Sequence, residues 1–265
     1  MKNLVILIVL SALLLNSGCI PDNQSGSLNQ QAAAALDRAR TSLLAEKKVA
    51  VDVLWALTQI QNKQQDTAID RFIQDMKKHI RNPTYLPGVF PDRPKVTLPD
   101  SIQPGIRRFI TYLSVPCGQP QETALRHLQQ YISEDASGYI LTHQLIVLLL
   151  SKQAELPIPP EMEKTKRRLL RKIYHEQLNL STVDCVDLYM ERVALILFFG
   201  NKKEIDLQAI ETWIHTIIEM QLPDGSWPLS KSILAYDGAT TSVSSPRSHT
   251  TVLAVMALQA HLRDH

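Results

Sequence analysis

The stretch 219–231, "EMQLPDGSWPLSK", carries Gln221, Gly225 and Trp227 within seven positions of one another. A helical pattern covers 207–220 immediately before it, and a loop rich in Pro, Gly and Ser follows it. The three residues therefore stand at the end of a helix, where the chain turns. What they do there depends on the helices on either side.

Helical periodicity covers most of the chain, and no segment makes a convincing strand. With only 9 Gly and 6% aromatic residues, the composition also suits a helical protein better than a β-sandwich, which needs many tight turns. The fold class predicted is therefore all-α. The expected helical segments are 33–61, 67–80, 105–115, 121–132, 139–151, 160–178, 184–199, 207–220 and 249–262.

From residue 121 onward the helices alternate between two characters. Segments 160–178 and 207–220 are amphipathic, and the first has a crowded charged face, which is typical of outer helices. Segments 139–151, 184–199 and 249–262 become apolar on all sides after their first turns, which is typical of buried helices. The pattern predicts three outer-inner hairpins of unequal length, a degenerate αα repeat.

Gln221, Gly225 and Trp227 match a Q-x-x-x-G-x-W pattern and resemble the repeat of the terpene cyclase and protein prenyltransferase superfamily. The resemblance covers roughly 121–262 with one good copy of the motif, and Thr216 stands where the family has an aromatic residue. It implies a partial α/α toroid, with the three motif residues in a structural role at a turn between helices. An unrelated helical bundle that happens to share the spacing is the alternative.

The family's chemistry transfers poorly to this chain. The D-x-D-D run of triterpene cyclases is absent, so cyclase activity is not expected. Cys185, Asp187 and His249 supply the residue types that hold zinc in protein prenyltransferases, but here the Cys precedes the Asp. A tetrahedral site would need a fourth ligand, and His143 could serve only if the helix ends converge. We therefore expect neither a metal nor another cofactor.

Polar residues gather near the N-termini of the expected inner helices. In a toroid the inner helices run parallel, so these N-termini would meet at one mouth. Two interpretations stay open: a structural one, in which Asp184 caps its helix and Glu191 pairs with His143 or Arg192, and a functional one, in which the group binds a ligand or performs acid-base chemistry. The candidate pocket residues are His143, Asp187, Glu191, Arg192 and His249.

The N-terminus has the pattern of an export signal. A charged head and a short apolar run from Leu4 to Leu15 lead to "NSGC" at Cys19, which resembles a bacterial lipobox except for Asn16 three positions before the Cys. The run is too short for a transmembrane helix, which needs about 20 residues. We expect a signal peptide at 1–18, lipidation of Cys19 and a flexible tether over 19–31. Because Ile20 and not Asp follows the Cys, the outer membrane, on its periplasmic side, is the expected location.

The remaining chain divides into a predicted N-terminal helical region with a Pro-rich loop, 32–103, and a toroid-like domain, 104–265. The expected function is that of an envelope lipoprotein, anchored to the membrane through lipid, that binds a lipid, glycan or protein. The alternative is an enzyme that uses the inner-helix mouth, either a lyase or hydrolase on an envelope polymer or a metal-dependent one. A formal net charge of +2 gives no reason to expect nucleic acid.

Two further features have competing interpretations. The basic residues between Lys164 and Lys172 form either a solvated helix face or a contact surface for anionic material. Cys117 and Cys185 are either separate buried thiols or, in an oxidising compartment, a disulfide.

If Cys19 is the lipid attachment site, Cys19→Ser should release the protein from the membrane fraction, because the acyl chains supply the membrane affinity. Fractionation and intact-mass measurement of the membrane-bound protein test this. A variant that stays in the membrane fraction with an uncleaved N-terminus would contradict the lipoprotein assignment.

Overall fold

The computed structural model describes residues 26–79, 122–154, 156, 161–180, 183, 185–228 and 246–263. Within these ranges the chain is all-α and contains no strand, as predicted. The α-helices are α2 (Leu28–Leu44), α3 (Val51–Lys63), α4 (Thr67–His79), α6 (Glu122–Ser133), α7 (Gly138–Gln153), α8 (Met162–Leu178), α9 (Val186–Phe199), α10 (Leu207–Glu219) and α12 (Pro246–Leu262), and a short 3₁₀ helix, η2 (Lys202–Glu204), follows α9.

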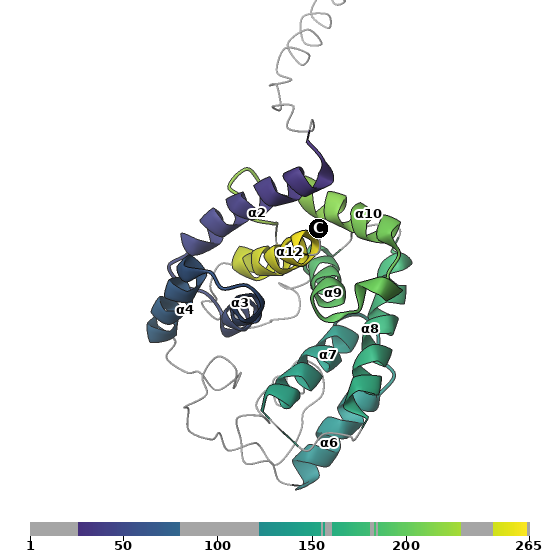
Figure 1. The fold of residues 1–265 in the computed structure, drawn as a ribbon. Helices are drawn as coiled ribbons and strands as arrows, with labels where there is room; N and C mark the ends of the chain where they lie inside the picture. Colours follow the sequence, from purple (N-terminus) through teal and green to yellow (C-terminus); the bar gives the residue numbers. More distant parts are fainter. Residues whose placement is uncertain are drawn as a thin grey trace, which may run out of the picture.

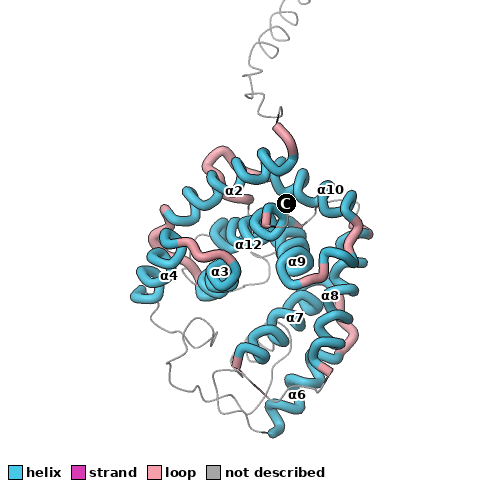
Figure 2. The backbone as a smooth tube through the Cα atoms, in the orientation of Figure 1, coloured by secondary structure: helices cyan, strands magenta, loops and turns pink. Residues whose placement is uncertain are grey.

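The helices form two layers (Figure 1). Helices α3, α7, α9 and α12 lie inside, and α2, α4, α6, α8 and α10 lie around them (Figure 2). The division follows from the sequence: α9 is apolar on nearly every side and almost wholly buried, whereas α8 buries only Leu169, Ile173 and Gln177. Helix α12 occupies the centre, where it packs mainly on α9, α2 and α3.

The N-terminal helices belong to the same core as the rest. The single helical run predicted for 33–61 is in fact two helices, α2 and α3, separated by residues 45–50. Helix α2 is outer and packs small side chains, Ala32, Ala35 and Ala39, toward α12, while α3 is an inner helix. One hydrophobic cluster joins helices on both sides of the boundary predicted at 103 and 104.

Helix α2 begins earlier than the predicted end of the tether. It starts at Leu28, where the Ser27 hydroxyl accepts from the Gln30 amide and the Gln30 side chain accepts from the Ser27 amide. This reciprocal capping satisfies backbone donors that a helix N-terminus otherwise leaves open. The last residues of the predicted tether therefore form the first turn of the folded domain.

The Q-x-x-x-G-x-W turn fastens α2 to the end of α10. The Gln221 amide donates to the Ala35 carbonyl at 2.8 Å and to the Gly225 carbonyl at 3.0 Å, and its oxygen accepts from Arg38 Nη2 at 2.6 Å. Gly225 has φ +84°, and a Cβ there would lie 2.5 Å from the Arg38 carbonyl oxygen. Both the backbone conformation and the closeness of α2 therefore require glycine at 225.

Trp227 joins α10 to α12 from the same turn. Its side chain is fully buried, and its indole Nε1 donates to the Ile217 carbonyl of α10 at 2.7 Å. Its backbone amide donates to the Thr251 hydroxyl of α12 at 3.2 Å. The three motif residues thus hold three helices together, α2, α10 and α12.

The C-terminal ends of the inner helices are closed by cations and aromatic rings. Lys63 of α3 donates to the Phe198 carbonyl at the end of α9 and lies 4.0 Å from the centre of the Phe198 ring. Lys202 donates in the same way to the Ala260 carbonyl of α12. Positive charge at a helix C-terminus is favourable, since the last carbonyls carry partial negative charge. The opposite, N-terminal ends carry the candidate site.

Several predicted features lie outside the described residues. These are the signal peptide with Cys19, the Pro-rich loop, the helix expected at 105–115, Cys117 and Asp184. None of the helices in the described part of the chain combines the length and the low polarity that crossing a bilayer requires.

Replacement of Trp227 by Ala should destabilise the fold by roughly 3 to 5 kcal/mol, because it empties a fully buried site between α10 and α12. Trp227→Phe is the matched control: it keeps an aromatic ring, loses the hydrogen bond to the Ile217 carbonyl and should cost less. Chemical denaturation of the two variants and the parent gives the values. An unchanged midpoint for Trp227→Ala would show that the turn does not hold these helices together.

Candidate functional site

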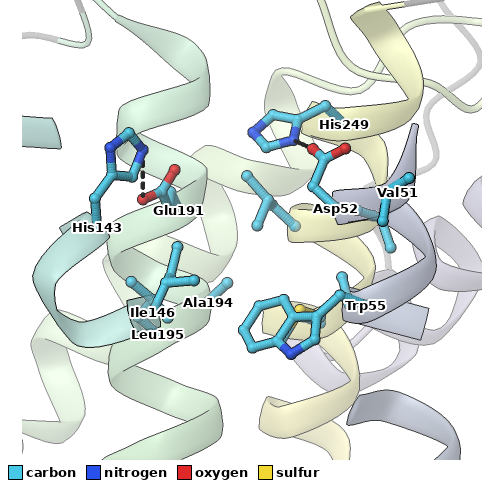
Figure 3. A pocket seen from close by; sticks show the side chains of 13 residues that line it. Val51, Asp52, Trp55, His143, Ile146, Glu191, Ala194, Leu195 and His249 are labelled. Carbon is cyan, nitrogen blue, oxygen red and sulfur yellow. Dashed lines mark hydrogen bonds and ion pairs between the residues drawn. The ribbon is translucent and has the colours of Figure 1, made fainter. Parts of the chain in front are cut away.

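A pocket of about 280 Å³ lies between the N-terminal halves of the four inner helices (Figure 3). Most of its lining is apolar, and its titratable members are two carboxyl groups and two imidazoles. The lining residues are Val51, Asp52, Trp55 and Ala56 of α3; His143 and Ile146 of α7; Glu191, Ala194 and Leu195 of α9; and His249, Val252, Leu253 and Met256 of α12.

Asp52 and His249 form a pair at the outer edge of the pocket. They come from the first turns of α3 and α12, and a hydrogen bond joins Asp52 Oδ2 to His249 Nδ1. Their side chains are 49% and 28% exposed, so the pair remains in contact with solvent. Burial lowers the pKa of His249, but the charge and hydrogen bond of Asp52 outweigh it and raise that pKa to about 9. His249 is therefore a cation at neutral pH.

Glu191 lies across the pocket from this pair, and its side chain is only 3% exposed. Its Oε1 atom is buried, accepts no hydrogen bond and lies 3.9 Å from His143 Nε2. Burial raises the pKa of Glu191 to about 7, against the opposing effects of the Thr142 hydroxyl and the charge of His249. A carboxyl group with this pKa is present in both protonation states near neutral pH.

His143 is a neutral base beside that carboxyl group. Burial lowers its pKa to about 3, and the nearby positive charge of His249 acts in the same direction. The ring also packs against Tyr139, with 5.7 Å between ring centres. At neutral pH the pocket wall therefore offers an uncharged imidazole next to an acid that can lose or gain a proton.

Of the two partners considered for Glu191 from the sequence, only His143 faces it. Arg192 turns the other way and pairs with Glu176 of α8, which also accepts from the Gly138 amide at 3.0 Å. Arg192 does not line the pocket and instead fastens α9 to the outer layer. The other candidate, Asp187, does not line the pocket either.

Asp187 is occupied by hydrogen bonds just behind the pocket wall. It accepts from the Tyr139 hydroxyl and, at 3.3 Å, from the Cys185 thiol. Cys185 is thus a thiol and not half of a disulfide, and its position is the N-cap of α9. The structural interpretation of the sequence had placed the cap at Asp184, one residue earlier and outside the described residues. The charge of Asp187 still reaches the site, since it raises the pKa values of both Glu191 and His249.

The lower end of the pocket is closed by Trp55. Its indole Nε1 donates to Gln153 Oε1 of α7 at 3.4 Å, and its ring stacks on Phe199 of α9 with 6.3 Å between centres. Below these rings lie Phe198 and the cation of Lys63. The cavity is therefore blind, with its polar groups at one end and aliphatic and aromatic carbon beneath them (Figure 3).

The sequence did not point to Asp52 or Trp55. Both lie on α3, which was assigned to a separate N-terminal region and to a longer helix. A signal was present, because "VDVLWALTQI" becomes apolar on all sides after its first turn, as the other inner helices do. The polar Asp52 at its N-terminus follows the same pattern as His143 and His249.

The described residues contain no group of three or more His, Cys, Asp or Glu side chains placed to hold a metal ion. The three residues that suggested zinc have other hydrogen-bond partners. Cys185 and Asp187 are hydrogen-bonded to each other and to Tyr139, and His249 is hydrogen-bonded to Asp52. No family model matches the chain, and a search of curated proteins finds no similar sequence. What the site does must therefore be argued from its geometry.

The raised pKa of Glu191 makes a prediction about stability. The carboxyl group has a pKa of about 7 in the folded protein and about 4.5 when unfolded, so the folded state binds more protons between these pH values and wild-type stability falls as pH rises through them. Glu191→Gln removes this effect. Stabilities should be equal below about pH 4.5, and above pH 7 the variant should be more stable by roughly 3 kcal/mol.

Denaturant unfolding of both proteins from pH 4 to pH 8 measures the difference. Glu163→Gln is the matched control, because the Glu163 side chain is 54% exposed in a surface pair with Lys152 and its loss should matter little. A Glu191→Gln variant less stable than wild type at pH 8 would mean that the carboxylate is structurally paired.

Proposed function

We propose that this protein is an envelope lipoprotein, anchored through Cys19, whose helical toroid domain binds a small, mainly apolar molecule in the pocket between its inner helices. The observation that carries the proposal is the blind cavity itself, apolar in its depth and with the buried, unpartnered Glu191 Oε1 in its wall. Buried polar atoms in folded proteins nearly always have partners. A ligand with a polar head and an apolar body supplies the missing one.

The size and lining of the cavity favour such a ligand over the other two classes expected from the sequence. A cavity of roughly 150 Å³ holds benzene, so about 280 Å³ has room for roughly ten to twelve non-hydrogen atoms. A glycan would need many hydrogen-bonding groups, whereas most of this lining is aliphatic or aromatic. A protein partner would need a broad surface and not a blind cavity.

The toroid assignment rests on two features. Outer and inner helices alternate in the layers of Figure 1, and the inner helices α3, α7, α9 and α12 all offer their N-terminal halves to one pocket, which is the convergence expected of parallel inner helices. The Q-x-x-x-G-x-W turn is a further point of resemblance, because Trp227 packs between α10 and α12.

The lipid anchor would keep this domain close to the membrane. Helix α2 begins at Leu28, so residues 20–27 separate the predicted attachment site from the folded domain. A chain of that length extends at most about 3.4 Å per residue, or about 27 Å. A ligand of envelope origin would then be met within a short distance of the bilayer surface.

Catalysis is the second candidate, and the pair formed by Glu191 and His143 favours it. A carboxyl group with a pKa of about 7 suits general acid-base catalysis at neutral pH, and the adjacent uncharged imidazole could form a hydrogen bond to a substrate. An enzyme of this kind would act on a molecule or end group small enough to enter the cavity.

Calorimetric titration of the purified full chain with 4-phenyl-1-butanol tests binding, since this neutral alcohol has the expected number of atoms. We expect saturable binding at one site. Ala194→Phe should weaken it by about tenfold or more, because the new ring fills the cavity between α9 and Trp55. Ala34→Phe adds the same ring at an exposed position of α2 and should leave binding unchanged.

A parallel titration of Ala194→Phe also corrects for heat from alcohol that enters the detergent in which the lipidated protein is kept. Thermal melts establish that both variants are folded. Absence of binding to wild type, or equal binding to wild type and folded Ala194→Phe, would rule out a ligand pocket at this position.

A further inference from the structure

We propose that the ligand of this pocket is an amphiphilic amine, whose protonated nitrogen binds Glu191 and whose apolar body extends toward Trp55. This inference rests on the proposed function, because it names the class of molecule that the same cavity takes. Three observations carry it: the balance of charge around the cavity, the Glu191 oxygen that accepts no hydrogen bond, and the separation of polar from apolar lining.

Carboxyl groups outnumber cations around the upper part of the cavity. Asp52 and Glu191 line it, and Asp187 stands behind the wall close enough to raise the pKa of Glu191. Among the described side chains that line the cavity, His249 supplies positive charge, and it is already paired with Asp52. Arg192 is directed to Glu176. With Glu191 ionised, the site therefore has an excess of negative charge.

Glu191 also has one carboxyl oxygen without a hydrogen bond. Its buried Oε1 accepts no hydrogen bond, and the nearest ring nitrogen, His143 Nε2, is 3.9 Å away, which is too long for one. A ligand ammonium group would supply a charge-assisted hydrogen bond, roughly twice as strong as the neutral bond from an alcohol. A ligand carboxylate would instead meet the charges of Asp52, Asp187 and Glu191.

The rest of the lining fixes how the ligand lies. The Glu191 carboxyl group is near the upper end of the cavity, while Ile146, Ala194, Leu195 and the Trp55 ring lie below it (Figure 3). A molecule whose nitrogen is at Glu191 can extend downward into this apolar part, where burial of its carbon is favourable. The proposed ligand is therefore an amine with one apolar chain or ring system.

Binding of an amine must compete with the proton on Glu191. The titratable and charged groups that face this residue are His143 on α7, Asp52 on α3, His249 on α12 and Asp187 on α9, with the Glu176–Arg192 pair on the α8 side. The Asp52 pKa lies below its usual value, and the pKa is about 3 for His143, about 9 for His249 and about 7 for Glu191. Of these four groups, Glu191 is the one expected to titrate between pH 5 and 8.

The affinity for an amine should accordingly rise by about tenfold per pH unit below pH 7 and level off above it, because an alkylamine stays protonated throughout. A neutral alcohol of the same shape has no charge to match and should show little dependence on pH.

The experiment compares three ligands that share one body: 4-phenylbutylamine, 4-phenyl-1-butanol and 4-phenylbutanoic acid. Each is titrated calorimetrically into the full chain at pH 5, 6, 7 and 8, with Ala194→Phe as the blank. At pH 8 we expect the amine to bind about tenfold tighter than the alcohol or better, and the acid to bind most weakly. Glu191→Gln should reduce the amine to the affinity of the alcohol and remove its pH dependence.

A second measurement needs no variant. Titrations of wild type with the amine at pH 6.5 in two buffers of different ionisation enthalpy should show release of about three quarters of a proton for each amine bound, and those with the alcohol should show none. An amine that binds no tighter than the alcohol, a preference that survives in Glu191→Gln, or binding without proton release would overturn the inference. Saturable binding of the alcohol in those cases would leave the proposed function intact, whereas failure of all three ligands would remove both.

Discussion

The hydrogen bonds made by the turn at Gln221, Gly225 and Trp227 are the constraint on which the arrangement of the helices depends. Gln221 reaches the backbone of α2, more than 180 residues earlier in the chain, and Trp227 reaches α10 and α12. Helix α12 is the central helix, in contact with α9, α2 and α3. Fixing its start also fixes His249, which lies two residues before Thr251, the residue that bonds to Trp227. A structural motif without chemistry of its own thereby sets one wall of the pocket.

The pocket follows from how the inner helices are closed. Toward their C-terminal ends, Phe198 and Phe199 of α9 pack together, and Lys63 and Lys202 donate to the last carbonyls of α9 and α12. Their N-terminal ends instead bring carboxyl and imidazole groups together above apolar side chains. Keeping the Glu191 carboxyl group buried with an open hydrogen-bonding position works against stability, and such a cost is commonly retained where a site has a function.

Much of this arrangement could be predicted from the sequence, because hydrophobic periodicity reports burial directly. The all-α class and the inner position of α7, α9 and α12 followed from helices that are apolar on all sides, and His143, Glu191 and His249 followed from polar residues at their starts. The inner position of α3 was not predicted. Residues 45–50 separate α2 from α3 but contain no Gly or Pro, so the sequence pattern indicated one continuous helix. Side-chain direction was not predictable either: Arg192 and Glu191 are neighbours in the chain, yet one turns to α8 and the other into the pocket.

The pKa of Glu191 tests the central claim most directly, because it depends at once on burial, on the absence of a strong partner and on the convergence of α3, α7, α9 and α12. A ¹³C NMR titration of side-chain carboxyl carbons, with Glu191→Gln used to assign the resonance, measures it. A single glutamate that titrates near 7 and disappears in the variant is the predicted result. A Glu191 that titrates at the ordinary value, about 4.5, would show that the carboxyl group is exposed or paired and would contradict the buried, unpaired carboxyl group in the pocket wall.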